Sequence, residues 1–123
     1  MSEKRNFSRV PFIAEIELVN QGEAKTCRLL DISLKGVLVE APPDWEGSMG
    51  DVFQLSLRLP NSDVNVLMEA GLVHQESGRL GFKWESIELN DFMHLRRLLE
   101  LNLGDESLVE REINALLENS SRD

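Results

Sequence analysis

Apolar and polar residues alternate along the first two thirds of the chain. From Phe12, and again from Phe53, apolar residues occupy every second position, which is typical of a β-strand with one buried face. Six such segments, separated by turn residues, lie at about 12–19, 25–30, 37–39, 53–59, 64–74 and 79–85. Strands of this length and spacing predict an antiparallel barrel or sandwich.

The period changes after Trp84 to that of an amphipathic helix. Asn90 is a candidate N-cap for a first helix, and Gly104 is a candidate stop. Asp105 can then cap a second helix. The apolar stripes of the two helices must cover something, and the barrel is the candidate within the chain, with a partner protein as the alternative.

The chain is long enough for one domain and short enough that a second is not expected, so we predict a single domain over residues 1–123. The expected parts are an N-terminal arm over 1–11, a barrel over 12–88 and helices over 89–123. Pro11 disfavours a helix through Val10. The arm has little apolar content and should be mobile in the free protein.

Charge and composition exclude several classes of function. The formal net charge of -9 argues against long nucleic acids and against anionic membrane surfaces. The sequence has no apolar run of the roughly 18 residues that a membrane span needs, and the polar N-terminus does not resemble a signal peptide. A single cysteine, Cys27, excludes an intrachain disulfide, is expected to fill a strand position, and favours the cytoplasm.

Residues for catalysis or metal binding are sparse. His74 and His94 are the histidines of the chain, and neither has Cys, Asp or Glu at metal-ligand spacing. We expect His94 at the boundary of a helix face and His74 in an exposed place near a turn. The sequence therefore predicts no enzyme, no metal and no cofactor.

Two short patterns remain. Arg5 and Arg9 form an Arg-x-x-x-Arg pair in the arm, and Asp31, Ser33 and Gly36 form an Asp-x-Ser-x-x-Gly pattern between two predicted strands. Either alone has an ordinary explanation, as solvated charges or as a turn. Together, in this order and with one hairpin between them, they resemble the signature of the PilZ domain family. The resemblance extends over the whole chain, including the segment from His94 to Asp105, which is similar to that of short, stand-alone PilZ proteins.

The resemblance implies a six-stranded antiparallel barrel that binds the bacterial second messenger cyclic di-GMP. Arg5 and Arg9 would pair with guanine edges or phosphates through their planar forks. Asp31 would accept from guanine N–H groups, and Ser33 would contact a phosphate or a base amine. Gly36 would allow a close approach of ligand or backbone. Ligand would order the arm over the barrel and so change the surface offered to a partner.

Three further residues are candidate ligand contacts. Lys4 stands where a basic residue in the family accompanies two intercalated ligand molecules, so it favours a ligand dimer. Asn6 could donate to a phosphate or remain solvated. His74 lies near the position of a ligand-flanking tryptophan in close relatives. Trp45 and Trp84 are expected to anchor the core or a loop.

The alternatives are a PilZ-like interaction module that does not bind nucleotide and, with less support, an unrelated barrel enzyme. Without a catalytic or effector domain in this chain, output is expected to pass through a protein partner, which the sequence does not identify, or through a change in self-association. Seven acidic against two basic residues over 100–123 place much of the negative charge at the helical end, whereas the arm over 1–10 carries +2.

Overall fold

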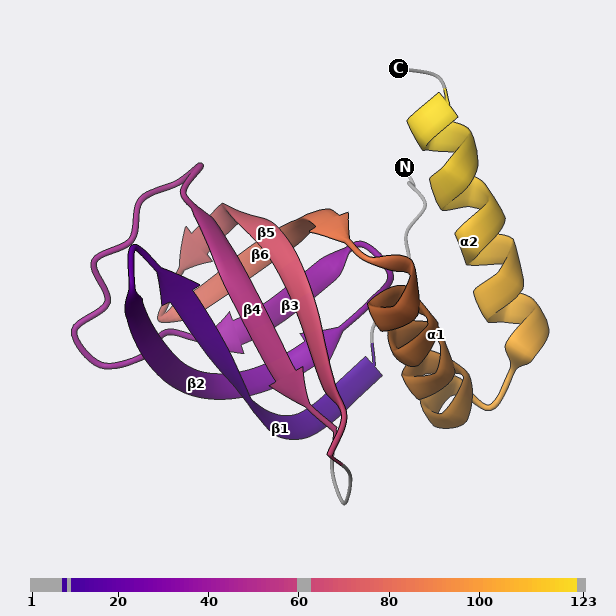
Figure 1. The fold of residues 1–123 in the computed structure, drawn as a ribbon, viewed down its shortest axis with the longest axis horizontal. Coiled ribbons are helices and arrows are strands. Elements are labelled where there is room, and N and C mark those ends of the chain that lie inside the picture. The colour runs from indigo at the N-terminus through magenta and orange to yellow at the C-terminus, as the bar shows by residue number, and fades with distance from the viewer. Residues whose placement is uncertain (1–7, 9, 60–62, 122–123) are drawn as a thin grey trace.

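The computed structural model describes residue 8, residues 10–59 and residues 63–121. Six strands are followed by two helices, as the sequence predicts (Figure 1). The elements are β1 Val10–Asn20, β2 Glu23–Ile32, β3 Gly36–Glu40, β4 Val52–Arg58, β5 Asn65–Glu76, β6 Arg79–Ile87, α1 Leu89–Leu103 and α2 Glu106–Ser121.

The strands form a closed antiparallel barrel in the order β1-β2-β3-β6-β5-β4. Closure comes from the pairing of β1 with β4, in which Ile16 lies opposite Leu57 and Leu18 opposite Leu55. This pairing decides between the two architectures that the alternation allows, because a sandwich would leave β1 and β4 as open edges. The predicted barrel with two C-terminal helices is confirmed.

Inward-facing side chains fill the barrel from every strand, at the alternate positions that the sequence pattern predicts. Fully or nearly fully buried members include Ile16, Leu18, Leu29, Val39, Leu55, Val66, Leu72 and Leu80. Cys27 belongs to this core, as expected for a strand position. Burial, and secondarily the nearby charge of Glu40, raises the pKa of the Cys27 thiol to about 12, so the side chain is an apolar filler rather than a nucleophile.

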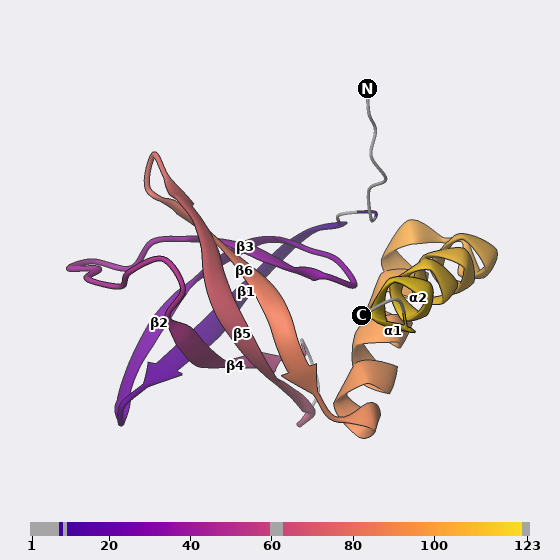
Figure 2. The same cartoon turned by 90° about the horizontal axis from the view of Figure 1, so that it is seen from above.

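Helix α1 lies against one end of the barrel, and α2 packs on α1 (Figure 2). Leu95, Leu98 and Leu99 of α1 are buried, and burying a leucine fully contributes about 1.5–3 kcal/mol. The expectation that the helical stripes cover the barrel is therefore correct for α1. From α2, Val109 is fully buried while Leu117 is 60% exposed.

The helix boundaries confirm two of the predicted caps and correct the third. Gly104 ends α1 in the left-handed conformation, at φ 69°, and the carboxylate of Asp105 accepts from the Leu108 amide at 3.1 Å. That bond, with a second from the Ser107 hydroxyl, lowers the pKa of Asp105. The prediction of Asn90 as the first N-cap is wrong. The amide of Phe92 donates to Glu88, so the helix begins two residues earlier, directly after β6.

The predicted arm is also shorter than expected. Val10 and Pro11, assigned to the arm, already belong to β1, because they pair with Ile32 and Asp31 of β2. Strand pairing extends further than the apolar alternation because the ladder bonds join backbones and do not depend on an apolar side chain at each position.

Candidate ligand-binding site

The strand register places the start of β1 beside the Asp-x-Ser-x-x-Gly segment. Val10 lies opposite Ile32, and Pro11 opposite Asp31. The candidate residues Lys4, Arg5, Asn6 and Arg9 lie outside the described residues, so the structure does not test them directly. Because Arg9 is bonded to Val10, the register nevertheless places the arm's attachment point within a residue or two of Asp31.

Ser8, between the two motif arginines, is described and bonded. Its backbone amide donates to both carboxylate oxygens of Glu112 in α2, at 3.1 Å each, and its hydroxyl donates to the same carboxylate at 2.5 Å. This contact joins the arm to the second helix across more than a hundred residues of sequence.

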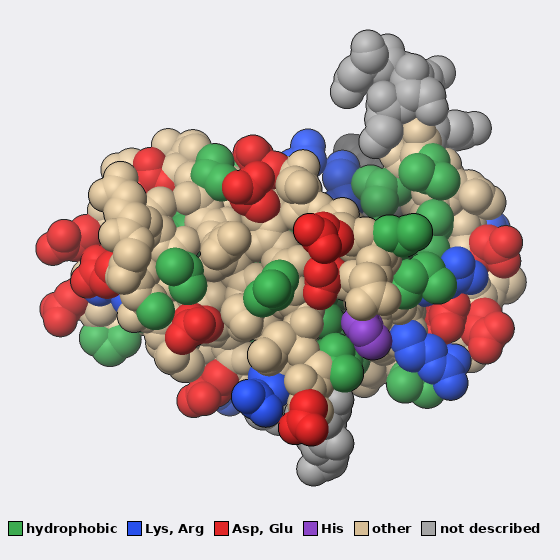
Figure 3. Space-filling model, viewed as in Figure 1, with side chains coloured by type: hydrophobic (Ala, Val, Ile, Leu, Met, Phe, Trp, Pro, Cys, Tyr) green, Lys and Arg blue, Asp and Glu red, His purple; other side chains and the backbone are tan. Residues whose placement is uncertain are grey.

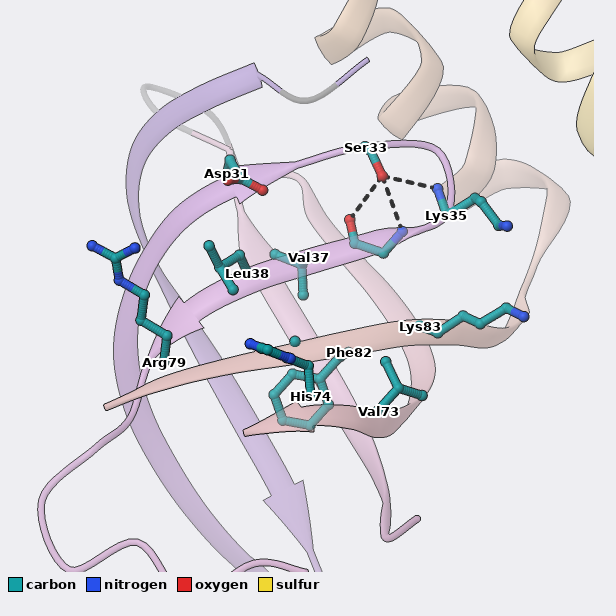
Figure 4. A pocket seen from close by; sticks show the side chains of 12 residues that line it. Asp31, Ser33, Lys35, Val37, Leu38, Val73, His74, Arg79, Phe82 and Lys83 are labelled. Atoms are coloured by element: carbon teal, nitrogen blue, oxygen red, sulfur yellow. Dashed lines mark hydrogen bonds between the residues drawn. The ribbon is translucent and has the colours of Figure 1, made fainter. Parts of the chain in front are cut away.

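The segment from Asp31 to Gly36 forms a tight, self-bonded turn between β2 and β3. The Ser33 hydroxyl accepts from the amides of Lys35, at 3.1 Å, and Gly36, at 3.3 Å, and lies 3.4 Å from the Gly36 carbonyl, to which it donates. The Ser33 amide donates to that same carbonyl at 2.9 Å. Ser33 is buried, at 7% exposure, so its hydroxyl shapes the turn from within (Figure 4).

Gly36 is required by a close backbone approach. A Cβ at this position would lie 1.9 Å from the carbonyl oxygen of Phe82 in β6, far inside contact distance. The sequence left open whether ligand or backbone needs the space, and in the structure the neighbour is backbone. Gly36 thus brings β3 and β6 together beneath the turn.

Trp84 anchors the turn from β6. Its indole Nε1 donates to the Ser33 carbonyl at 3.3 Å, and its backbone amide donates to the Lys35 carbonyl at 2.8 Å. Trp45 has a corresponding place in the loop that follows β3, where its indole donates to the Gln75 side chain at 2.9 Å and its ring packs on Phe53. Both tryptophans are anchors, as expected from the sequence.

A surface hollow of about 530 Å³ adjoins the turn, over the outer faces of β3, β6 and the end of β5 (Figure 4). Asp31 and His74 both line it, so the structure brings together two residues that are 43 positions apart in the chain. The full lining is Asp31, Ser33, Lys35, Gly36, Val37, Leu38, Val73, His74, Arg79, Gly81, Phe82 and Lys83.

The hollow is cationic although the chain is acidic. Lys35 and Lys83 lie at one side and Arg79 at the other, with Asp31 as the one acidic residue of the lining (Figure 4). The His74 imidazole lies between them, 53% exposed, with its Nε2 3.6 Å from a Glu76 carboxylate oxygen. The face seen in Figure 3 carries acidic side chains over both the barrel and the helices, with Lys and Arg side chains among them. A local excess of positive charge with low-dielectric walls favours an anionic ligand.

The sequence did not identify the three cations of this hollow. Arg79 and Lys83 stand at outward positions of β6, which alone indicates only solvent exposure. Their relation to Asp31 depends on the pairing of β3 with β6, where Val37 lies opposite Phe82 and Glu40 opposite Arg79. The sequence shows that Arg79 and Lys83 occupy outward-facing positions of one strand. It does not show that β3 is the neighbouring strand, which is what brings them near Asp31.

Neither a metal-binding cluster nor a membrane-spanning helix occurs in the described part of the chain. Residues 8, 10–59 and 63–121 contain no group of three or more His, Cys, Asp and Glu side chains arranged to hold a metal. No helix in the same ranges is long and apolar enough to cross a membrane. His94 is half-buried on α1, in agreement with its predicted place at the boundary of a helix face.

Comparison with known proteins agrees with this fold and motif. The family model of the PilZ domain matches residues 3–101. Alginate biosynthesis protein Alg44 of Pseudomonas syringae pv. tomato is 26% identical over 120 residues, which cover 94% of this chain and 31% of that protein. The chain therefore spans about a third of the length of this curated relative.

Two solved structures share the fold. The PilZ domain of YcgR from Escherichia coli, determined with c-di-GMP, superposes with a TM-score of 0.65 at 17% identity and covers 94% of this chain and 98% of that one. The Bacillus subtilis inhibitor of motility MotI superposes with a TM-score of 0.66 at 16% identity, over 92% of this chain and 53% of that one.

Proposed function

Because the chain belongs to the PilZ domain family, we propose that it is a receptor for cyclic di-GMP, bound between the N-terminal arm and the cationic hollow over β3 and β6. The observation that carries this proposal is the register of β1 with β2. It pairs Pro11, where β1 follows the arm, with Asp31, at the edge of a hollow lined by Lys35, Arg79 and Lys83.

The ligand's chemistry suits these groups. Cyclic di-GMP has two guanines and two phosphates, so it needs acceptors for guanine N–H groups, donors for O6 and N7, and cations for the phosphates. The Asp31 carboxylate is such an acceptor, and the guanidinium groups of Arg5 and Arg9 supply forked donors. Lys35, Lys83 and Arg79 add positive charge around the hollow.

The remaining candidates take narrower roles. The Ser33 hydroxyl is engaged within the turn, which supports a role in shaping the site beside any phosphate contact. His74 offers an imidazole face at the floor of the hollow, and Gly81 opposite it leaves room, since a Cβ there would lie 3.0 Å from the His74 Cβ. Asn6 is a further candidate donor, and Lys4 favours two intercalated ligand molecules.

The mechanism that follows is an ordering of the arm over the hollow. The arginine contacts form only when the arm lies on the ligand, so binding changes the surface around the start of β1. Output then passes to a protein partner of unidentified nature in the cytoplasm, where the messenger acts. The chain would serve as an adaptor without a catalytic step or cofactor of its own.

Isothermal titration of the protein with cyclic di-GMP tests this function. We expect heat with a stoichiometry of one or two ligands per chain, and two would support the role of Lys4. Arg9→Ala should weaken binding by about tenfold or more, because a charge-assisted contact is lost. The matched control is Arg58→Ala, which removes the same charge from an exposed position on β4 and should bind as the wild type does.

Absence of heat with the wild-type protein would contradict the proposal. It would favour the second candidate, a PilZ-like interaction module without nucleotide binding. Equal weakening by Arg9→Ala and Arg58→Ala would also count against it, because only general electrostatic attraction would then be at work.

A further inference from the structure

The turn beside the hollow is hydrogen-bonded to β6, and Trp84 supplies a side-chain bond as well as a backbone bond. The indole N–H donates to the Ser33 carbonyl at 3.3 Å, from a residue 51 positions later in the chain. The backbone of the same residue donates to Lys35 at 2.8 Å. Two of the three turn residues between β2 and β3 are therefore bonded to a single residue of another strand.

The Trp84 ring is itself fixed. Leu80, Phe82 and Trp84 follow one another at alternate positions of β6, and the first two are buried in the barrel. Trp84 is half-buried and packs against the same core. Its N–H therefore approaches the turn from the barrel side and leaves the hollow open, unlike a ring that would stack on ligand.

The indole bond to the Ser33 carbonyl affects the orientation of the turn relative to the barrel. Asp31 and Lys35 flank the Ser33 peptide, and both line the hollow. Within the turn, the Ser33 hydroxyl ties the amides of Lys35 and Gly36 to one another, but these bonds would survive a tilt of the whole turn. The indole bond opposes such a tilt, because it joins the turn to the rigid barrel.

We propose that Trp84 is a positioning residue for the ligand site: its indole N–H holds the Ser33 carbonyl and thereby fixes the turn so that Asp31 and Lys35 face the hollow. This inference rests on the proposed function. A turn that is already in its binding orientation loses less conformational freedom on association, so the contribution of Trp84 is to affinity through preorganisation.

The decisive variant is Trp84→Phe, which keeps an aromatic ring in the core and removes the N–H. We expect the affinity for cyclic di-GMP to fall about threefold to tenfold, as for loss of one hydrogen bond. Trp45→Phe is the matched control, since it removes an indole bond to Gln75 from the loop after β3. Its affinity should stay within about twofold of the wild type.

Amide hydrogen exchange in the ligand-free protein supplies a measure that a purely packing role would not change. In Trp84→Phe the amides of Lys35 and Gly36 should exchange faster, while amides in β4 keep their wild-type rates. A lowered thermal midpoint with wild-type affinity and wild-type exchange in the turn would overturn the proposal and leave Trp84 as a core residue.

Two further results separate this proposal from the proposed function. In the Trp45→Phe protein, Trp84 is the sole tryptophan, and its emission should stay unchanged when cyclic di-GMP is added, because the indole lies on the barrel side of a turn that is already oriented. A clear shift of that emission on binding would show that the turn moves and would overturn preorganisation, even if Trp84→Phe does not fold. If the wild type and Trp84→Phe bind cyclic di-GMP equally well, the positioning role fails while the proposed function stands. If the wild type binds no cyclic di-GMP, the proposed function fails by itself, and faster exchange of the turn amides in Trp84→Phe would still show that the indole holds the turn.

Discussion

The two ends of strand β3 carry connections of opposite character. At its start, the turn over 33–35 is short and internally bonded, and it adjoins a hollow with three cationic residues and one acidic residue. At its end, the loop over 41–51 adjoins a second hollow, of about 360 Å³, whose charged lining is Glu23, Lys25, Asp44, Glu46 and Asp51. Each connection is anchored by one tryptophan.

The difference shows that the net charge of the chain does not predict the local charge of a given hollow. The lining of the hollow after β3 disfavours a dianionic ligand and the lining of the hollow before it favours one, although the two hollows adjoin connections of the same strand. Shape alone would not distinguish them, because both are open hollows of a size that small ligands occupy.

The largest expected effect concerns the backbone beneath the two connections. Gly36→Ala should lower the free energy of unfolding by about 2–3 kcal/mol, because the new Cβ meets the Phe82 carbonyl in a strand that cannot easily retreat. Gly47→Ala should cost less, about 1–2 kcal/mol, because its Cβ meets the Trp45 ring, and a side chain can shift where a strand backbone cannot, at the expense of the indole bond to Gln75. Urea denaturation of both variants measures the difference. Equal losses would show that the two connections are equally rigid.

The second effect concerns the acidic residues. Asp31→Asn should weaken cyclic di-GMP binding by about tenfold or more, because a charged acceptor for guanine N–H groups is lost. Asp44→Asn makes the same change at the other hollow, and asparagine tolerates the positive φ of 60° found there, so its titration should match the wild type. If Asp31→Asn binds as tightly as the wild type, Asp31 has no direct part in recognition.

The smallest effect concerns the lysines. Lys83→Gln should weaken binding about threefold at low salt, and the loss should shrink as salt rises, since an exposed charge acts through a screened field. Lys25→Gln, at the acidic hollow, should leave binding unchanged or slightly improve it. Titrations at two salt concentrations compare the pair, and a larger loss for Lys25→Gln would contradict the assignment of the cationic hollow.

Local patterns predicted the fold because each element is encoded where it lies. The alternation around Ile16 and Leu55 predicted strands, and Gly104 and Asp105 predicted the break between the helices. The prediction of Asn90 as N-cap was wrong because the chain passes from β6 into α1 without a loop. The helix therefore already includes Asn90, and Glu88 occupies the cap position without a side-chain bond.

The site was only partly accessible from the sequence. Asp31, Ser33 and Gly36 stand together in the chain, and so their association was visible. Arg79 and Lys83 reach the same hollow only through the pairing of β3 with β6, and the Trp84 bond to Ser33 joins residues 51 positions apart. Such contacts follow from barrel closure, which no local pattern records.

Closure of the barrel also limits how a partner can bind. All six described strands have a hydrogen-bonded neighbour on each side, since β1 pairs with β4 as well as with β2. Open stretches nevertheless remain within single strands: residues 23–28 of β2 pair with β1 but not with β3, whose pairing with β2 lies between Leu29 and Ile32. Strand addition, a common mode of peptide recognition, is therefore confined to such short stretches of the described strands. Interaction variants should accordingly be made first on side chains of the barrel face, the connections and the helices.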